Sequence, residues 1–467
     1  MSFVFYDTET TGLDKHFDQI LQFAAIRTDA DLKELERFEI RCRLRGHMAP
    51  SPGAMRVTGV TVAQLTDQSL PSHYNMIRAI REKLGSWAPA IVTGYNSIAF
   101  DENFLRQALY QTLHSPYLTQ SNSNGRADVM TLVQCTAFFE PAVLVIPTGD
   151  KSKLVFKLDQ VAPANGFNHA NAHDALSDVE ATIHLCRIIR DKAPEAWSNF
   201  TRFSQKAAVA DFVESEPAFV FTEHHFGKPY PYVVTLIEFD ADQSSLAYVL
   251  DLSVDLAALS ALDDTKLAAK LKASPKPIRR LKTNSAPHVL CLDDIPAHVR
   301  TRLPSREMIE VQLDWVANNN AFIERALGVF RATQKEYEPA AHVEQMIYDE
   351  FLTQADAAIL DAFHDAQWSD RLQLLDGLSD GRFRILGRRL IHAEQPDVLP
   401  ADIRAELDAE VACRLRGTVT GGEPWLTLPA ALVQTNDLLQ NATAKERELL
   451  SDLASYLLQR IDALGPH

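Results

Sequence analysis

Near its start the chain reads Phe3-Val-Phe-Tyr-Asp-Thr-Glu-Thr-Thr-Gly12, and this stretch decides how the rest is interpreted. The apolar run Phe3 to Tyr6 predicts a short buried strand that stops at the acids, with a turn at Thr11-Gly12. Asp7 and Glu9 are two residues apart, so both carboxylates should point to one face at the strand's end. Like charges held this close repel unless a cation lies between them, and carboxylate oxygens suit Mg²⁺ or Mn²⁺.

The composition is that of a globular protein with several domains. The 467 residues exceed the size of a single core, so we expect two to four domains. There is no secretory signal at the start and no run near the ~20 apolar residues that cross a bilayer, so we expect a cytoplasmic protein without membrane attachment. The five cysteines form no Cys-x-x-Cys pair, which argues against a disulfide framework or a structural zinc site.

The charge distribution gives two opposing signals about nucleic acid. A net charge of −16 argues against a nucleic-acid partner, but phosphate binding depends on the local field along a groove. One stretch is strongly basic and predicts either a solvated basic face or a surface that follows phosphates. Its basic residues are Lys266, Lys270, Lys272, Lys276, Arg279, Arg280, Lys282, Arg300, Arg302 and Arg306.

Residues 1 to about 192 alternate between strand and helix signals. We expect strands at 3–6, 19–28, 35–44 and 90–94, with an antiparallel start to the sheet because the first three are closely spaced. The segment 47–59 reads as a loop rich in Pro and Gly. Helices are expected at 72–87, 101–113, 128–139, 154–164 and 172–192. The fold class is therefore α/β, a mixed sheet with helices on its faces.

The rest of the chain divides into a β-rich part and a helical part. Apolar runs at 219–222, 232–237 and 246–250 predict a small β-barrel or sandwich. From about residue 338 helical patterns dominate, with amphipathic segments at 343–351, 355–364, 403–414 and 446–461. We therefore expect three domains, at residues 1–192, 193–335 and 338–467.

Three further residues join the opening acids. Asp101 follows the predicted strand and turn at 90–97 and starts a helix, where an acid is common for capping reasons alone. His173 and Asp178 are five residues apart, roughly 140° around a regular helix. If both serve one site, His173 lies on the lead-in to the helix and Asp178 on its first turns. Each signal is weak alone, but their order and element types together favour one acidic site.

This ordered set resembles the DEDD exonuclease superfamily in its His-containing branch, whose fold is ribonuclease H-like. Asp7, Glu9, Asp101 and Asp178 match the four acids, and His173 matches the histidine. Other segments are similar to the bacterial exodeoxyribonuclease I family, in which an SH3-like β domain and a helical domain follow. These segments are Phe23-Ala-Ala-Ile-Arg-Thr-Asp29, Pro52-Gly-Ala54, Thr58-Gly-Val-Thr61, Gly94-Tyr-Asn-Ser97, Ala164-Asn-Gly166 and Asn171-Ala-His-Asp174.

The resemblance implies a processive 3′ to 5′ exonuclease that degrades single-stranded DNA to nucleoside 5′-monophosphates in DNA repair or recombination. Two Mg²⁺ ions, or Mn²⁺ in their place, would stabilise charge on the attacking and leaving oxygens. We expect Asp7 to bridge them, Glu9 and Asp178 to be ligands, and Asp101 to be an outer ligand. His173 would be the general base; because it must be neutral, activity should rise from mildly acidic to alkaline pH.

Substrate contacts are expected around the acids. The family implies that Glu9 bonds the terminal 3′-hydroxyl, and the matched segment adds Asn171 as a contact. Lys157 stands where the family usually has a substrate-binding Arg, so the charge is kept but the bidentate fork is not. Ala393-Glu394 ahead of Pro396 replace the family's usual Arg-Asn.

Aromatic and basic side chains near the site are candidates for tracking a single strand, which proteins hold by base stacking and a cationic groove. Phe104, Tyr110 and Tyr117 could stack on bases or could simply pack in the core. Arg106 and Lys157 would supply the positive charge.

Two alternatives remain open at the level of sequence. One is an exoribonuclease of the same superfamily, and the other is a catalytically silent module that binds DNA or docks a partner. By resemblance, a single-stranded-DNA-binding protein is an expected partner through its acidic C-terminal tail. We expect the chain itself to be a monomer.

Overall fold

The first sheet is mixed, as the sequence predicts. The computed structural model describes residues 2–168, 174–225, 227–334, 338–417 and 422–465. In these residues the sheet has strand order β3-β2-β1-β4-β5, antiparallel from β3 to β1 and parallel from β1 to β5. The strands are β1 (Phe3–Thr10), β2 (Ile20–Thr28), β3 (Glu34–Arg41), β4 (Ile91–Gly94) and β5 (Gly125–Asp128). The sequence did not predict β5.

Strand β1 extends beyond the apolar run Phe3 to Tyr6 and continues through the two acids, which the sequence placed at its end. Asp7 is paired with Ala24 and Glu9 with Gln22 of β2. The register shifts only after Glu9, so the long β2 strand keeps both acids inside the ladder. The carboxylates are therefore carried by rigid, paired backbone.

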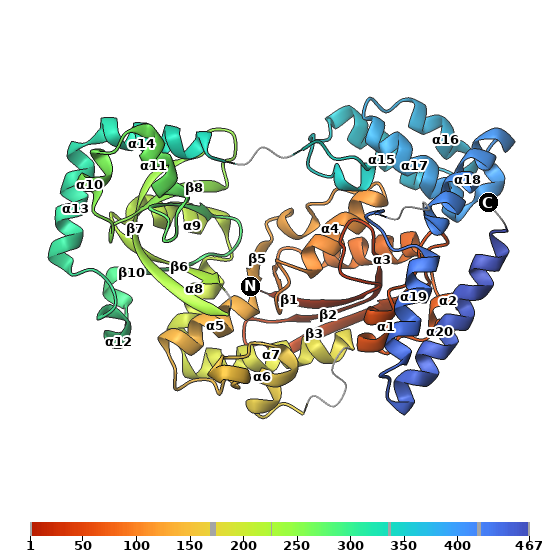
Figure 1. Cartoon of the computed structure of the whole chain (residues 1–467), viewed down its shortest axis with the longest axis horizontal. Helices are drawn as coiled ribbons and strands as arrows, with labels where there is room; N and C mark the ends of the chain where they lie inside the picture. The colour runs from red at the N-terminus through yellow and green to blue at the C-terminus, as the bar shows by residue number, and fades with distance from the viewer. Residues whose placement is uncertain (1, 169–173, 226, 335–337, 418–421, 466–467) are drawn as a thin grey trace.

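Alternate side chains of β1 pack on opposite faces of the sheet. Phe3 and Phe5 lie in one core with Val179, whereas Val4 and Tyr6 lie in the other core with the helices that follow β3 and β4. This gives three layers, helix, sheet and helix (Figure 1). The helices of these layers are α3 (His73–Ser86), α4 (Asp101–Gln111), α5 (Val129–Phe139), α6 (Leu158–Ala164) and α7 (Ala175–Lys192).

Two short helices occupy the region around the predicted loop 47–59. They are α1 (Pro52–Thr58) and α2 (Val62–Thr66). The Ser51 side chain accepts a bond from the backbone N–H of Ala54, and Gly59 closes α1 in a left-handed conformation with φ of 70°. The loop prediction was wrong because cap residues were interpreted as turn residues.

The second sheet is antiparallel with order β10-β6-β7-β8-β9, which confirms the β-rich part. The sequence found β6 to β8 but neither β9 nor β10. The strands are β6 (Phe219–His225), β7 (Lys228–Phe239), β8 (Leu246–Asp251), β9 (Ile278–Lys282) and β10 (His288–Cys291). Helices before, within and after this sheet are α8 (Pro194–Arg202), α9 (Lys206–Ser215), α10 (Leu256–Ser260), α11 (Asp264–Lys272), α12 (Ala297–Arg300), α13 (Arg306–Asn318) and α14 (Asn320–Ala332).

The C-terminal part is helical, as predicted, except at its start. The segment expected as a helix at 343–351 forms only a 3₁₀ turn at Val343–Gln345. Two of its carbonyls are bonded to α4: Gln107 Nε2 donates to Glu344 O at 2.6 Å, and Tyr110 Oη donates to Val343 O at 2.9 Å. The helices that follow are α15 (Gln354–Asp365), α16 (Trp368–Asp376), α17 (Gly381–Glu394), α18 (Ala401–Arg416), α19 (Leu428–Leu439) and α20 (Ala444–Ala463).

The C-terminal helices wrap around the first sheet's layer of helices (Figure 1). Phe363 and Phe383 pack in one cluster with Tyr110, and Leu457 packs in another with Met55 of α1. We call residues 1–192 the first domain, 193–335 the second domain and 338–467 the helical domain, and this division is our proposal. In the described part of the chain, no helix combines the length and the apolar character needed to cross a membrane.

Candidate active site

Three carboxylates from two elements converge at one end of the first sheet. Asp7 and Glu9 come from β1, and Asp178 comes from the first turn of α7. One oxygen of each lies within 4.8 Å of the other two. Glu9 is only 8% exposed. Three converging carboxylates are the ligand set that hard divalent cations prefer, so this group can hold a metal ion.

Burial and mutual repulsion raise the pKa of these acids. Burial, followed by the charges of Asp178 and Asp101, raises the pKa of Glu9 from 4.5 to about 8. The pKa of Asp7 is raised well above its ordinary value, mainly by burial and then by Asp101. The group therefore holds protons near neutral pH in the absence of a cation, and a cation would compete with those protons.

Asp101 reaches this site from the start of α4. Its Oδ1 accepts bonds from the backbone N–H of Thr8 at 3.0 Å and from Thr8 Oγ1 at 2.6 Å. Because Thr8 lies between Asp7 and Glu9, Asp101 is bonded to the strand at its acidic centre. Asp101 is 3% exposed, and burial raises its pKa to about 7. Its engagement with Thr8 fits an outer position in the acidic group.

The loop before α4 depends on a close approach of two backbones. A Cβ on Gly94 would lie 2.4 Å from the carbonyl oxygen of Tyr6, so only glycine fits at the end of β4. Asn96 then adopts φ of 61°, and the carboxylate of Asp128 accepts the backbone N–H groups of Asn96 and Ile98 at 3.0 and 3.1 Å. These contacts bring the start of α4 next to β1.

Asp174 is a residue of the site region that the sequence analysis did not assign. It caps α7, where its carboxylate accepts Ser177 N at 3.4 Å. The same side chain bonds Arg41 Nη2 of β3 at 2.7 Å and Gln22 Nε2 of β2 at 3.2 Å. The first turn of α7, which carries Asp178, is thereby fixed to the sheet. His173 and Asn171, two predicted site residues, lie outside the described residues.

The RNase T exonuclease family model matches residues 4–186. Exodeoxyribonuclease I of Haemophilus influenzae is 28% identical over 423 residues, 84% of this chain and 88% of that protein. Exodeoxyribonuclease I of Escherichia coli K12 is 24% identical over 375 residues, 77% of this chain and 78% of that protein. The chain belongs to the exodeoxyribonuclease I family.

Solved structures agree with this assignment along the whole chain. Exonuclease I from Methylocaldum szegediense has a TM-score of 0.85 at 25% identity and covers 98% of this chain and 99% of that one. Escherichia coli exonuclease I in complex with a dA16 oligonucleotide has a TM-score of 0.82 at 21% identity, covering 99% of each chain. The resemblance and the fold expected from the sequence are thus confirmed.

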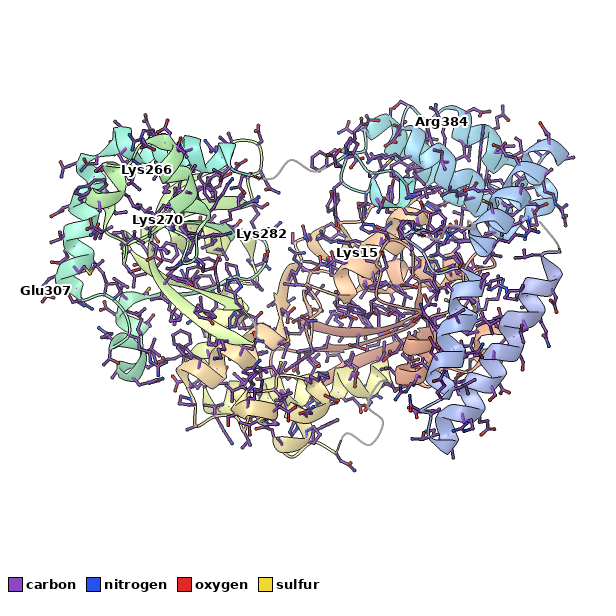
Figure 2. The ribbon with its side chains drawn as sticks, viewed as in Figure 1. Lys15, Lys266, Lys270, Lys282, Glu307 and Arg384 are labelled. Carbon is purple, nitrogen blue, oxygen red and sulfur yellow. The ribbon has the colours of Figure 1, made fainter. Side chains whose placement is uncertain are left out.

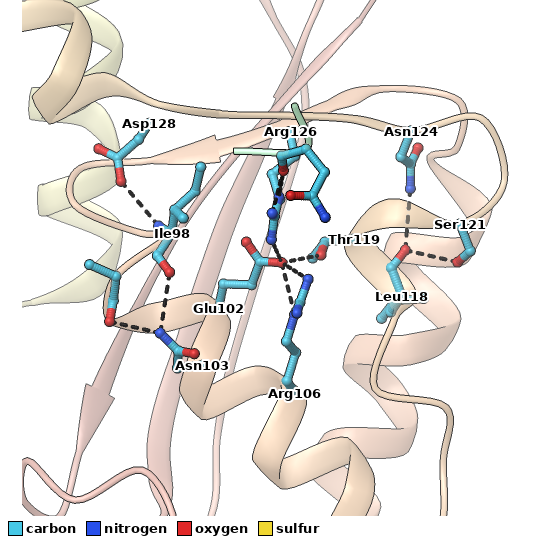
Figure 3. Close-up of polar contacts among 12 residues, drawn as sticks. Ile98, Glu102, Asn103, Arg106, Leu118, Thr119, Ser121, Asn124, Arg126 and Asp128 are labelled. Atoms are coloured by element: carbon cyan, nitrogen blue, oxygen red, sulfur yellow. Dashed lines mark hydrogen bonds and ion pairs between the residues drawn. The ribbon is translucent and has the colours of Figure 1, made fainter. Parts of the chain in front are cut away.

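A buried glutamate next to Asp101 bonds three side chains around α4 (Figure 3). Glu102 is 2% exposed, and its Oε1 accepts bonds from Arg106 Nη2 at 2.6 Å, Arg126 Nη1 at 2.5 Å and Thr119 Oγ1 at 2.9 Å. The sequence analysis missed Glu102 and Arg126, because their pairing joins α4 to a strand that it had not predicted.

Arg106 and Tyr117, two predicted substrate contacts, lie together beside this glutamate. The Arg106 guanidinium is 5.7 Å from the centre of the Tyr117 ring, and its Nη1 lies 3.4 Å from Tyr348 Oη of the helical domain. Arg106 therefore links Glu102 of α4 to Tyr348 of the helical domain.

The structure places the other candidates differently. Lys157 is exposed at the start of α6, and no hydrogen bond or ion pair of the described residues joins it to the acids. Phe104 and Tyr110 are 2% and 1% exposed. Both pack in cores, so they are not stacking platforms, whereas Tyr117 remains partly exposed.

The basic stretch of the second domain does not form one continuous surface. Figure 2 shows Lys282 on the side toward the first domain, while Lys266 and Lys270 lie over α11, farther from it. Arg279 is 3% exposed, pairs with Glu223 at 2.5 Å and lies 3.2 Å from the centre of the Tyr232 ring. Arg279 therefore stabilises the sheet and is unavailable to DNA.

Proposed function

We propose that the chain is a processive exonuclease that removes nucleotides from the 3′ end of single-stranded DNA and releases nucleoside 5′-monophosphates. The observation that carries this proposal is the convergence of Asp7, Glu9 and Asp178 beside Asp101, in a member of the exodeoxyribonuclease I family. The solved complex of the Escherichia coli relative with dA16 supports single-stranded DNA as the substrate.

The acids would hold two Mg²⁺ ions, for which Mn²⁺ may substitute, with Asp7 as the bridging ligand, Glu9 and Asp178 as ligands and Asp101 as an outer ligand. When bound, such ions stabilise the negative charge that develops on the attacking and leaving oxygens. The protein's own contribution is to hold the acids on rigid backbone before substrate arrives.

The remaining chemical roles belong to two residues. His173 is proposed as the base that takes a proton from the attacking water, which requires its neutral form. Glu9 is proposed to contact the terminal 3′-hydroxyl, which would select chain ends. Activity should therefore rise from mildly acidic to alkaline pH.

The strand itself is proposed to contact Arg106, Tyr117, Lys157 and Asn171. Arg106 and Tyr117 lie next to each other at the helical domain, so a stacked base and a phosphate could be held by one contact pair. Lys282, on the side of the second domain toward the first, would extend the cationic path.

The test is a digestion assay on end-labelled single-stranded DNA, duplex DNA and RNA of one sequence, with Mg²⁺ or with EDTA. Asp7→Asn should abolish hydrolysis and leave DNA binding in EDTA intact, and Asp211→Asn, an exposed aspartate of α9, should behave like the parent. Hydrolysis by Asp7→Asn at the parental rate would contradict the proposed site. Preferred cleavage of RNA would favour the exoribonuclease alternative, and binding without hydrolysis would favour a silent module.

We also propose a partner and a state for the chain in solution. A single-stranded-DNA-binding protein would dock through its acidic C-terminal tail, and the chain would be a cytoplasmic monomer. Fluorescence anisotropy with a labelled acidic tail peptide against a scrambled peptide tests the first point. Light scattering tests the second, and a dimer mass would contradict it.

A further inference from the structure

A cavity lies between the first domain and the helical domain, at the end of α4 opposite Asp101. Its volume is about 240 Å³, and its lining includes Gln111 and Thr112, just where α4 ends. At 1.5 Å per helical residue, this is roughly 15 Å from the acidic site. It is therefore a separate cavity, large enough for a small organic molecule.

One wall of this cavity carries an arginine that has no ion-pair partner among the described residues. Arg45 donates to Gln111 Oε1 at 2.7 Å and to Met48 Sδ at 3.3 Å, but it makes no ion pair with any described residue. By contrast, Arg389 and Arg414, which also line the cavity, both pair with Glu344, at 3.3 and 2.5 Å, and Arg389 also pairs with Glu410 of the same lining.

Burial and the positive charges of these arginines lower the pKa of a neighbouring histidine, His47. Burial, and then the charges of Arg45, Arg414 and Arg389, hold the pKa of His47 well below its ordinary value. Burial is the larger cause of this shift, and the positive charges of the three arginines, its smaller cause, would favour an anion in the cavity.

A second polar group in the lining lacks a partner. His73 is the first residue of α3 and is 3% exposed. Its Nε2 has no hydrogen-bond partner in the part of the chain that the structure describes, although it belongs to the cavity wall. A buried polar atom without a partner destabilises the protein, and a hydrogen bond from a ligand atom would remove that penalty.

Part of the remaining wall is apolar, and part is acidic, because Glu394 and Glu410 also line the cavity. Leu386, Leu390 and Leu407 line it together with the buried Tyr74. Ala393 lies at the exposed rim of the cavity.

We propose that this cavity binds a small organic anion, with a carboxylate or phosphate head beside Arg45 and His73 and an apolar body against Leu386 and Leu390. Because the walls come from two domains, the bound anion would hold the helical domain on the first domain.

Calorimetry on the full-length protein tests this site, in EDTA so that no metal-dependent binding at the acidic site contributes. The probes are inorganic phosphate, phenylacetate and 2′-deoxyadenosine 5′-monophosphate, which separate the head group from the body. We expect one-to-one binding of at least one organic probe, tighter than binding of inorganic phosphate. Arg45→Gln should weaken it about 10-fold or more.

Changes at the exposed rim keep the test independent of folding. Ala393→Glu should weaken binding several-fold through like-charge repulsion, while Ala393→Lys should not weaken it. Arg404→Gln, an exposed arginine of α18, is the control and should have no effect. The proposal is overturned if no probe binds saturably, if phosphate binds as tightly as the organic probes, or if Arg45→Gln and Ala393→Glu both leave the affinity unchanged.

Discussion

Replacing Glu9 with glutamine should stabilise the metal-free protein while it removes activity. In the folded chain the pKa of Glu9 is about 8, against 4.5 for an ordinary glutamate. The folded state thus binds more protons than the unfolded state between these values, and the free energy of unfolding falls as pH rises. At about 1.4 kcal/mol per pH unit, the cost is at most about 2 kcal/mol at pH 6 and about 4 to 5 kcal/mol at pH 8.

The assay is urea denaturation in EDTA at pH 6 and pH 8. Glu9→Gln keeps the size of the side chain and cannot ionise, so its unfolding free energy should exceed that of the parent, with the larger gain at pH 8. Glu140→Gln, at the exposed end of α5, is the control and should show no such gain. Hydrolysis by Glu9→Gln should fall by more than the ~10- to 100-fold loss typical of residues that support a metal ligand.

Adding Mg²⁺ in place of EDTA should raise the free energy of unfolding of the parent. At a concentration 100 times its dissociation constant, the ion should stabilise the parent by about 2.7 kcal/mol. Glu9→Gln, which lacks one ligand, should gain much less. The reasoning is refuted if Glu9→Gln is no more stable than the parent in EDTA, or if its gain is the same at both pH values, because neither burial nor the neighbouring acids would then penalise the charged form of Glu9.

Two further changes test how the acids are held in place. Thr8→Val removes the 2.6 Å hydrogen bond to Asp101 at nearly constant side-chain volume. We expect the free energy of unfolding, measured by urea denaturation, to fall by about 1 to 2 kcal/mol and the rate of hydrolysis to fall by about 10- to 100-fold. Thr8→Ser, which keeps the hydroxyl, should keep both values. Gly94→Ala would place a methyl group 2.4 Å from the Tyr6 carbonyl oxygen and should lower the free energy of unfolding by about 1 to 3 kcal/mol in urea denaturation. Gly85→Ala is the control and should cause no such loss, because no atom lies within 4 Å of the added methyl group. A urea denaturation curve of Gly94→Ala identical to that of the parent would contradict the close approach of β4 to β1.

The acidic site was accessible to sequence reasoning because its signals are local. The shared face of Asp7 and Glu9 follows from the two-residue period of a strand, whereas Asp178 was assigned from the order of the acids along the chain and from the family resemblance. The structure brings all three together. The extent of β1 was not accessible, because its last residues are paired only through the register with β2.

The errors have long-range causes. The segment at 343–351 has an amphipathic pattern, but bonds from Gln107 and Tyr110 hold its carbonyls in a non-helical path. The sequence analysis assigned no role to Glu102, because its partner Arg126 lies on a strand of only four residues that was not predicted. Tertiary contacts of this kind leave no periodic trace in the sequence.

Helix α4 carries Asp101 at its first residue and the docking contacts of the helical domain along the rest of its length. Gln107 and Tyr110 bond the backbone that leads into that domain, and Arg106 reaches Tyr348. An enzyme truncated after residue 192 would therefore lose the contacts that the helical domain makes with α4, the helix that positions Asp101. Nuclease engineering that aims for a minimal catalytic fragment would have to redesign this exposed flank before it could preserve the geometry of the acids.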